Sequence, residues 1–169
     1  MTKQRIAVLT SLGVILGLEA CVAARPAPPS KPSFYQSLAA ASASVDSAMA
    51  RDMISAYRRN NGLGPLTLDP DLQRFAEQEA AGMAGADRPG AAEVVKARVA
   101  AAGIRSPAVN LSAGYHTLAE AFSGWRDSPE HKRVLLDRSA GRMGIATAYA
   151  PHSKYKVYWA LVVAAPETE

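Results

Sequence analysis

Residues 108–136 decide the fold of this chain and read AVNLSAGYHTLAEAFSGWRDSPEHKRVLL. The segment at the start of this stretch, residues 109–114, is predicted to be a loop. A helix is predicted to begin directly after Thr117, because Thr117 and the carboxylate of Glu120 have the spacing of a capping box. The sequence here therefore predicts a loop followed by a capped helix.

One face of this helix is apolar. Leu118, Phe122 and Trp125 recur at the spacing of a helix, so the face that carries them is predicted to pack against the rest of the domain. Trp125 is the largest of the three side chains. We expect Trp125 to be buried where the last helices meet the sheet.

A second short helix is predicted to begin at the Ser-Pro pair that follows. Ser128 can cap this helix with its hydroxyl, and Pro129 suits its first position. His131 then lies in the first turn, where the positive end of a helix lowers the pKa of an imidazole. The neutral imidazole that results can coordinate a metal or hydrogen-bond a ligand. It can equally be a packed side chain that fixes the start of the helix.

The composition indicates one folded domain with a tail. The chain has 169 residues, of which 49% are hydrophobic and 20% charged, so it can bury a core and is not disordered throughout. Its net charge of +4 is small, and basic and acidic residues are interspersed rather than gathered in a stripe. A nucleic-acid-binding surface is therefore not expected.

The N-terminus has the parts of a secretory signal. Lys3 and Arg5 precede an apolar run, residues 6–18, which is short for a membrane-spanning helix. Leu-Glu-Ala-Cys follows at residues 18–21 and resembles the lipobox of bacterial lipoproteins. We therefore predict a lipoprotein-type signal peptide at residues 1–20, with lipidation at Cys21. The alternative is ordinary signal cleavage near this position, with Cys21 incidental.

The rest of the chain divides into three parts. Residues 21–44 are rich in Ala, Pro and Ser and are predicted to be an extended tether. Residues 45–165 are predicted to form the folded domain, and residues 166–169 a polar tail. Because Cys21 is the only cysteine, no disulfide within the chain is possible.

Hydrophobic periodicity predicts helices first and strands last. Helices are expected from about residue 45 to 61, after the Asp-Pro pair at residues 69–70, and over residues 91–102. Residues 82–90 are predicted to be a loop, and residues 104–112 irregular with a possible short strand. Residues 143–149 and 157–163 alternate apolar and polar and predict two antiparallel strands. The order indicates an α+β domain in which helices cover an antiparallel sheet.

Several of these segments resemble the bacterial CAP superfamily, also called SCP-like domains. Residues 53–72 are similar to the opening helix and loop of that family, and residues 125–131 match its W-x-x-S-P-x-H motif. The apolar run at 134–136, Met-Gly-Ile-Ala at 143–146 and Tyr-Trp at 158–159 match later motifs in the same order. The resemblance implies a three-layer α-β-α sandwich with a central antiparallel sheet and a groove.

In that family the groove often holds two His and two Glu that can bind a divalent cation. Of this set only His131 is clearly retained, because the Glu of the family's E-N-I motif is Val109 and a position often occupied by His is Glu79. We therefore expect a more apolar groove, without a tightly bound metal and without catalytic residues. The groove candidates are His131, Glu79, Asn110, Ser128 and Glu130.

Together these features predict a secreted, lipid-anchored domain that binds a ligand or partner and does not act as an enzyme. The expected location is extracytoplasmic, with the membrane contacted through acylated Cys21. The expected partner is a small apolar ligand or an envelope protein, and neither a cofactor nor a nucleic acid is expected. Two alternatives stay open: a metal-assisted or peptidase-like hydrolase that uses His131, and a purely structural envelope lipoprotein.

Overall fold

The structure is a computed structural model, and it describes residues 31–167. The predicted signal peptide, Cys21 and the first part of the predicted tether lie outside the described residues. No helix within the described part has the length and apolarity needed to cross a membrane.

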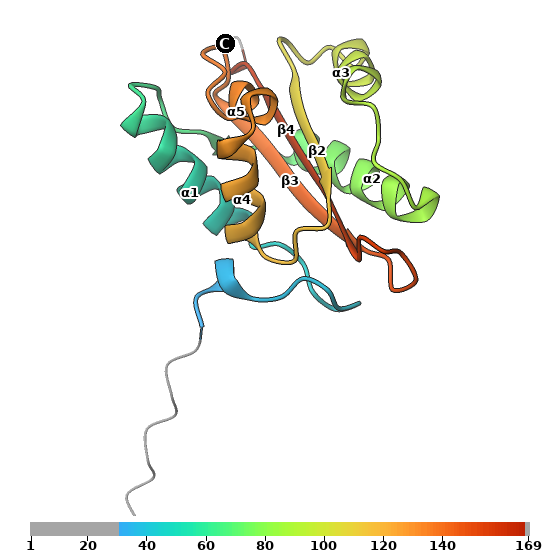
Figure 1. The fold of residues 1–169 in the computed structure, drawn as a ribbon. Coiled ribbons are helices and arrows are strands. Elements are labelled where there is room, and N and C mark those ends of the chain that lie inside the picture. Colours follow the sequence, from blue (N-terminus) through green and yellow to red (C-terminus); the bar gives the residue numbers. More distant parts are fainter. Residues whose placement is uncertain (1–30, 168–169) are drawn as a thin grey trace, which may run out of the picture. The chain divides into compact units, whose positions relative to one another are not determined.

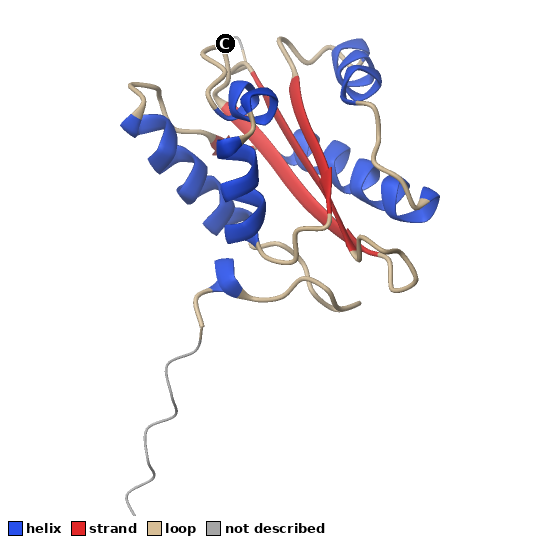
Figure 2. Cartoon of the chain, viewed as in Figure 1, coloured by secondary structure: helices blue, strands red, loops and turns tan. Residues whose placement is uncertain are grey.

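Helices and strands follow one another in a mixed order (Figures 1 and 2). Their order along the chain is η1 (Ser33–Tyr35), α1 (Ser47–Asn60), β1 (Thr67–Leu68), α2 (Pro70–Ala86), α3 (Ala92–Ala101), β2 (Ala108–Ala113), α4 (Leu118–Asp127), α5 (Pro129–Leu135), β3 (Arg142–Tyr149) and β4 (Val157–Ala164).

The strands form one four-stranded sheet in the order β1-β3-β4-β2. β4 pairs antiparallel with both β3 and β2, whereas the two-residue β1 pairs parallel with β3. The sheet is thus mixed rather than wholly antiparallel. β4 is internal to the sheet and β2 is an edge strand.

Helices cover both faces of the sheet and make the three predicted layers (Figure 1). α1, α4 and α5 pack on one face, and α2 and α3 pack on the other. Alternate residues of β4 point to opposite faces, and every residue of that strand is buried. Trp159 and Leu161 enter the core under α1 and α4, whereas Tyr158 and Val162 enter the core under α2 and α3. The near-continuous apolar character of β4 follows from this double burial.

Trp125 is buried as predicted, with 0% of its surface exposed. Its indole Nε1 donates to the Ser112 hydroxyl across 3.0 Å. Its ring packs edge-to-face against Trp159, with ring centres 5.9 Å apart. The tryptophan thereby joins α4 to the middle and the edge of the sheet.

Close approach between α2 and β3 depends on a glycine. A Cβ atom at Gly144 would collide with the backbone of Leu72 and Gln73 in the first turn of α2. The helix can therefore lie directly on the strand, and Gln73 bonds the backbone of Ile145 through both ends of its amide.

Most predicted helix starts are confirmed. Thr117 and Glu120 form the capping box in both directions, and Asp69 caps α2 by accepting from Asp71 N–H and Leu72 N–H. Ser128 is the N-cap of α5, but its side chain makes no capping hydrogen bond. The start of α5 therefore rests on the proline at its first position and on backbone bonds.

Two segments differ from the sequence-based expectation. Residues 109–114 were expected to form a loop, but residues up to Ala113 belong to β2, whose pairing with β4 is a long-range interaction. Residues 82–90 were expected to form a loop, but α2 continues to Ala86. Gly82 and Gly85 do not stop this helix, because its buried face, which includes Ala80 and Met83, packs on the sheet. The helix ends instead at Asp87 in a left-handed conformation with φ of 50°.

Candidate ligand-binding groove

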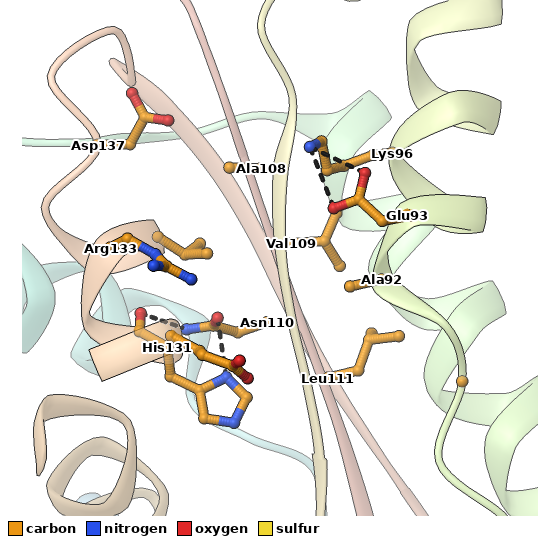
Figure 3. Close-up of a pocket in the computed structure, with 13 residues that line it drawn as sticks. Ala92, Glu93, Lys96, Ala108, Val109, Asn110, Leu111, His131, Arg133 and Asp137 are labelled. Atoms are coloured by element: carbon orange, nitrogen blue, oxygen red, sulfur yellow. Dashed lines mark hydrogen bonds and ion pairs between the residues drawn. The ribbon is translucent and has the colours of Figure 1, made fainter. Parts of the chain in front are cut away.

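A groove of about 550 Å³ runs along β2 between α3 and α5 (Figure 3). The strand supplies the floor and the two helices supply the walls. The lining residues are Gly90, Ala92, Glu93, Lys96, Ala108, Val109, Asn110, Leu111, Glu130, His131, Arg133, Val134 and Asp137. The groove therefore lies at the edge of the sheet.

Asn110 and His131 form a double hydrogen bond at the centre of this groove (Figure 3). The Asn110 Nδ2 donates to the backbone carbonyl of His131 across 3.0 Å, and its Oδ1 lies 3.0 Å from His131 Nδ1. Because the carbonyl can only accept, the amide orientation is determined, and Oδ1 must accept a proton carried by Nδ1. The geometry therefore assigns the Nδ1–H tautomer and leaves Nε2 as an acceptor.

The surroundings of His131 favour this neutral form. Burial lowers the pKa of His131 below its usual 6.5, and the neighbouring carboxylate of Glu130 opposes this shift. Within residues 31–167, no hydrogen bond involves the Nε2 atom. His131 can accordingly accept a hydrogen bond from a ligand.

Val109 and Leu111 point away from His131, because residues alternate along a strand. Both side chains belong to the core under α2 and α3, and only 5% and 9% of their surfaces are exposed. The position of the family's E-N-I glutamate is thus occupied here by a core valine.

Glu79 lies on α2 behind the α3 wall rather than in the groove lining. Its carboxylate is 2.8 Å from the Arg98 guanidinium, and its side chain is 14% exposed. It also lies against Gly90, where a Cβ atom would collide with it. Glu79 is therefore an ion-paired structural residue at the end of the α2–α3 connection.

The walls of the groove are charged rather than apolar, contrary to the expectation of a more apolar groove. Glu93 and Lys96 form an ion pair of 3.1 Å on the α3 wall. Asp137 accepts from both the backbone N–H and the hydroxyl of Ser139. On the α5 wall, Glu130 and Arg133 have no ion pair with any residue of the described part.

The predicted site residues are only partly brought together. His131, Asn110 and Glu130 line one groove, whereas Ser128 is not among the lining residues and Glu79 lies behind Gly90. Sequence reasoning missed Glu93, Lys96 and Arg133. Their i to i+3 spacing on two short helices was visible, but only the edge position of β2 brings those helices to opposite sides of one groove.

The residues present do not fit the divalent cation that the family resemblance implies. Among residues 31–167, no three His, Cys, Asp or Glu side chains converge to hold a metal ion. The nearest candidates are a single imidazole and carboxylates that are exposed or paired with cations. A zinc site needs three or four converging ligands, so this donor set does not supply one.

Three solved bacterial structures share this fold. They are an extracellular protein containing an SCP domain from Bacillus anthracis, an outer surface protein from Borrelia burgdorferi and a cysteine-rich secretory protein from Staphylococcus aureus. Their TM-scores are 0.59, 0.60 and 0.58, their sequence identities are 15%, 15% and 16%, and they cover 71%, 71% and 70% of this chain. This chain in turn spans 40%, 92% and 38% of theirs.

A search of curated proteins gave no match. The sequence model of the CAP family, described as the cysteine-rich secretory protein family, matches residues 51–163, which is more than half of the chain. That match includes α2, the whole sheet except the last residue of β4, and every residue that lines the groove. The chain therefore belongs to the CAP family.

Proposed function

We propose that this protein is an extracytoplasmic CAP domain, anchored through lipidated Cys21, that binds a partner in the groove between α3 and α5 without catalysing a reaction. One observation carries the proposal. Asn110 holds His131 in the tautomer that presents Nε2 as an acceptor, in a groove with charged walls.

The chemistry of the lining residues favours binding over hydrolysis. A hydrolase that uses a side-chain nucleophile needs that nucleophile within reach of a base. The described residues that line the groove include a base, His131, but no Ser, Thr, Tyr or Cys. The charged walls favour a polar partner, such as a segment of another envelope protein, over a small apolar ligand.

The proposed location is supported by the N-terminal sequence and by the similar structures. Those structures are described as belonging to an extracellular protein, an outer surface protein and a secretory protein. The Leu-Glu-Ala-Cys sequence at residues 18–21 is the basis for lipidation at Cys21. Radiolabelled palmitate should be incorporated into the wild-type chain and not into Cys21→Ser, and incorporation into that variant would contradict the anchor.

Binding in the groove can be tested by titrating the purified protein with fractions of a bacterial envelope. The fractions are a lipid extract, a cell-wall digest and a peptide digest, and the readout is the NMR signals of the His131 ring and the Asn110 side-chain amide. At least one fraction is expected to shift both signals and to leave the ring of His152 unchanged. The absence of any shift, or ester or peptide hydrolysis lost in His131→Ala, would overturn the proposal.

A further inference from the structure

We infer that the groove binds an extended peptide, which pairs as an added strand with the open edge of β2 and carries a basic and an acidic residue two positions apart. This inference rests on the proposed function and names the chemical class of the partner.

The register of β2 determines which of its backbone groups are free. The Gly114 N–H donates to the Val157 carbonyl across 2.9 Å, and Ser112 lies opposite Trp159 in the same ladder. In an antiparallel pair every second residue bonds to the neighbouring strand, so Asn110 and Ser112 bond to β4. Val109 and Leu111 therefore direct their N–H and C=O groups away from β4.

These four backbone groups have no protein partner. Within residues 31–167, no hydrogen bond outside the ladder involves the backbone of Val109 or Leu111. Both residues line the groove, so their free backbone groups point away from β4 into it. Backbone groups in such a place need a partner, and an unpaired strand edge is a ready template for another strand.

The sequence of β2 does nothing to prevent such pairing. Natural edge strands are commonly protected by a lysine, a proline or an inward-pointing charge. The six residues of β2 are Ala-Val-Asn-Leu-Ser-Ala and include none of these. The edge is instead recessed between α3 and α5, which limits the occupants that can reach it.

The recess selects a single extended segment. The sheet edge of a second copy could not enter, because its own α3 and α5 would meet the walls of the first groove. The chain's own tether is also a poor strand, because its prolines lack the N–H that a ladder needs. Those prolines are Pro26, Pro28, Pro29 and Pro32. A linear peptide of a partner protein has no flanking helices that would collide with the walls of the groove.

The charges on the α5 wall specify which peptide fits. Glu130 and Arg133 lie one turn apart on the same helix, with Cβ atoms roughly 5–6 Å apart by helix geometry. Side chains two apart on a strand are separated by about 6.6–6.8 Å on one face, so two peptide side chains can meet both charges. On the opposite wall Gly90 and Ala92 carry no charge, and Lys96 is paired with Glu93.

The direction of α5 fixes the order of the two charges. α5 begins beside His131, at the Leu111 end of the groove, and leads to Asp137 at the Ala108 end (Figure 3). A peptide that is antiparallel to β2 runs from the Leu111 end to the Ala108 end. Its basic residue, opposite Glu130, therefore precedes its acidic residue, opposite Arg133.

The probe is the capped, fluorescein-labelled peptide Thr-Ala-Lys-Val-Asp-Ala-Thr, whose binding to the full purified protein is measured by fluorescence anisotropy. Its Val and Ala side chains face α3, so their N–H groups pair with the edge. N-methylation of the Val and of the first Ala is expected to weaken binding at least about tenfold, because two hydrogen bonds are lost. A peptide with Lys and Asp exchanged has the same composition and is also expected to bind more weakly.

Two protein variants complete the test. Val109→Pro removes one N–H that points away from β4, while the hydrogen bonds to β4 stay intact. This variant is expected to bind the peptide at least about tenfold more weakly. Arg133→Glu changes only an exposed charge and is therefore expected to fold. It tests the inference even if the proline variant does not fold. This variant should prefer a peptide with Lys in place of Asp, which wild type should bind poorly.

The outcomes separate this inference from the proposed function. Equal binding of the N-methylated peptide, no change of preference in Arg133→Glu, or no binding of the probe at all would overturn the peptide inference. If a lipid or cell-wall fraction still shifts the His131 and Asn110 signals, the proposed function stands without the peptide. If the probe binds but leaves those signals unchanged, it binds outside the groove, and the peptide inference is contradicted.

Discussion

The Arg58 guanidinium donates through Nη1 to the Leu135 carbonyl across 2.9 Å and joins the last turn of α1 to the end of α5. Only 1% of Arg58 is exposed. The same guanidinium donates to the carbonyls of Gly64, Asp137 and Ala140 at 2.8–2.9 Å. Burial lowers the pKa of Arg58, and the Asp137 carboxylate opposes this shift. A buried cation thus organises the loop that leads from α5 to β3.

Arg58→Met should destabilise the domain by roughly 3 kcal/mol or more, because it leaves several buried carbonyl oxygens without donors. Urea denaturation followed by circular dichroism measures the change. Arg59→Met is the matched control, since Arg59 is exposed on the same turn and should change stability by less than about 0.5 kcal/mol. Equal effects of the two changes would show that the hydrogen bonds from Arg58 to the four carbonyls contribute nothing to stability.

Trp125→Ala should cost about 3–5 kcal/mol, because it leaves a cavity between α4 and Trp159 and removes the donor to Ser112. This loss is a large part of the stability of an ordinary domain. Trp125→Phe retains part of the ring contact and should cost less. An unchanged melting midpoint in the alanine variant would contradict the burial of this side chain.

Gly144→Ala and Gly85→Ala should have opposite effects. The first places a methyl group against the backbone of α2 and should prevent α2 from packing on β3. The second adds a methyl group inside α2, where no atom lies within 4 Å, and should stabilise the protein by about 0.5–1 kcal/mol. Thermal denaturation of both variants tests the pair, and a stable Gly144→Ala would contradict the close approach of helix and strand.

The stability of the protein should depend on pH through His131. Its pKa is lowered in the folded state, so between that pKa and 6.5 the unfolded chain binds more protons. The free energy of unfolding must therefore rise with pH across this window and fall as the pH drops through it. His131→Gln should remove this contribution to the pH dependence of the free energy of unfolding, measured by urea denaturation at several pH values. A slope unchanged in His131→Gln would contradict the assignment.

Removal of the Glu130 charge tests the cause of that shift. The Glu130 carboxylate opposes the lowering of the His131 pKa, so Glu130→Gln should lower the pKa further. The measurement is an NMR pH titration of the His131 ring, with His152 in the exposed hairpin as the internal reference. A rise in the pKa would be the wrong sign for this electrostatic explanation.

Zinc should bind more weakly than about 1 µM, because one imidazole with exposed or paired carboxylates offers too few ligands. Isothermal titration calorimetry of the purified protein measures this directly. One-to-one binding tighter than that, abolished by His131→Ala, would contradict the expectation and would favour the metal-assisted hydrolase.

The sequence correctly predicted the helix starts and strands that depend on patterns within a few neighbouring residues. The capping box of Thr117, the Asp69-Pro70 start and the alternation in β3 and β4 each act over a few residues. Residues 109–114 were predicted to be a loop, and residues 104–112 to be irregular with a short strand. Val-Asn-Leu-Ser at 109–112 does alternate apolar and polar, but this strand gains its pairing only from β4, about fifty residues later. The two glycines of α2 were likewise read as a break, although packing on the sheet overrides their low helix propensity.

The groove could be predicted only in part for the same reason. The motif that contains His131 was visible, and Asn110 was a candidate from the family pattern. Their double hydrogen bond needs β2 as an edge strand beside α5, which no local pattern encodes. The same placement puts Glu93 and Lys96 of α3 on the opposite wall, so their part in the groove depends on tertiary structure.

One of the two internal strands of the sheet, β4, is also its last strand along the chain, and it supplies side chains to the cores on both faces. A chain under synthesis cannot close either core before residues 157–164 have emerged. Each α-helix of residues 31–167 packs in a core that includes side chains of β4. Before β4 is synthesised, these helices can contact only an incomplete sheet. Folding should therefore begin late and cooperatively, when synthesis of the domain is almost finished.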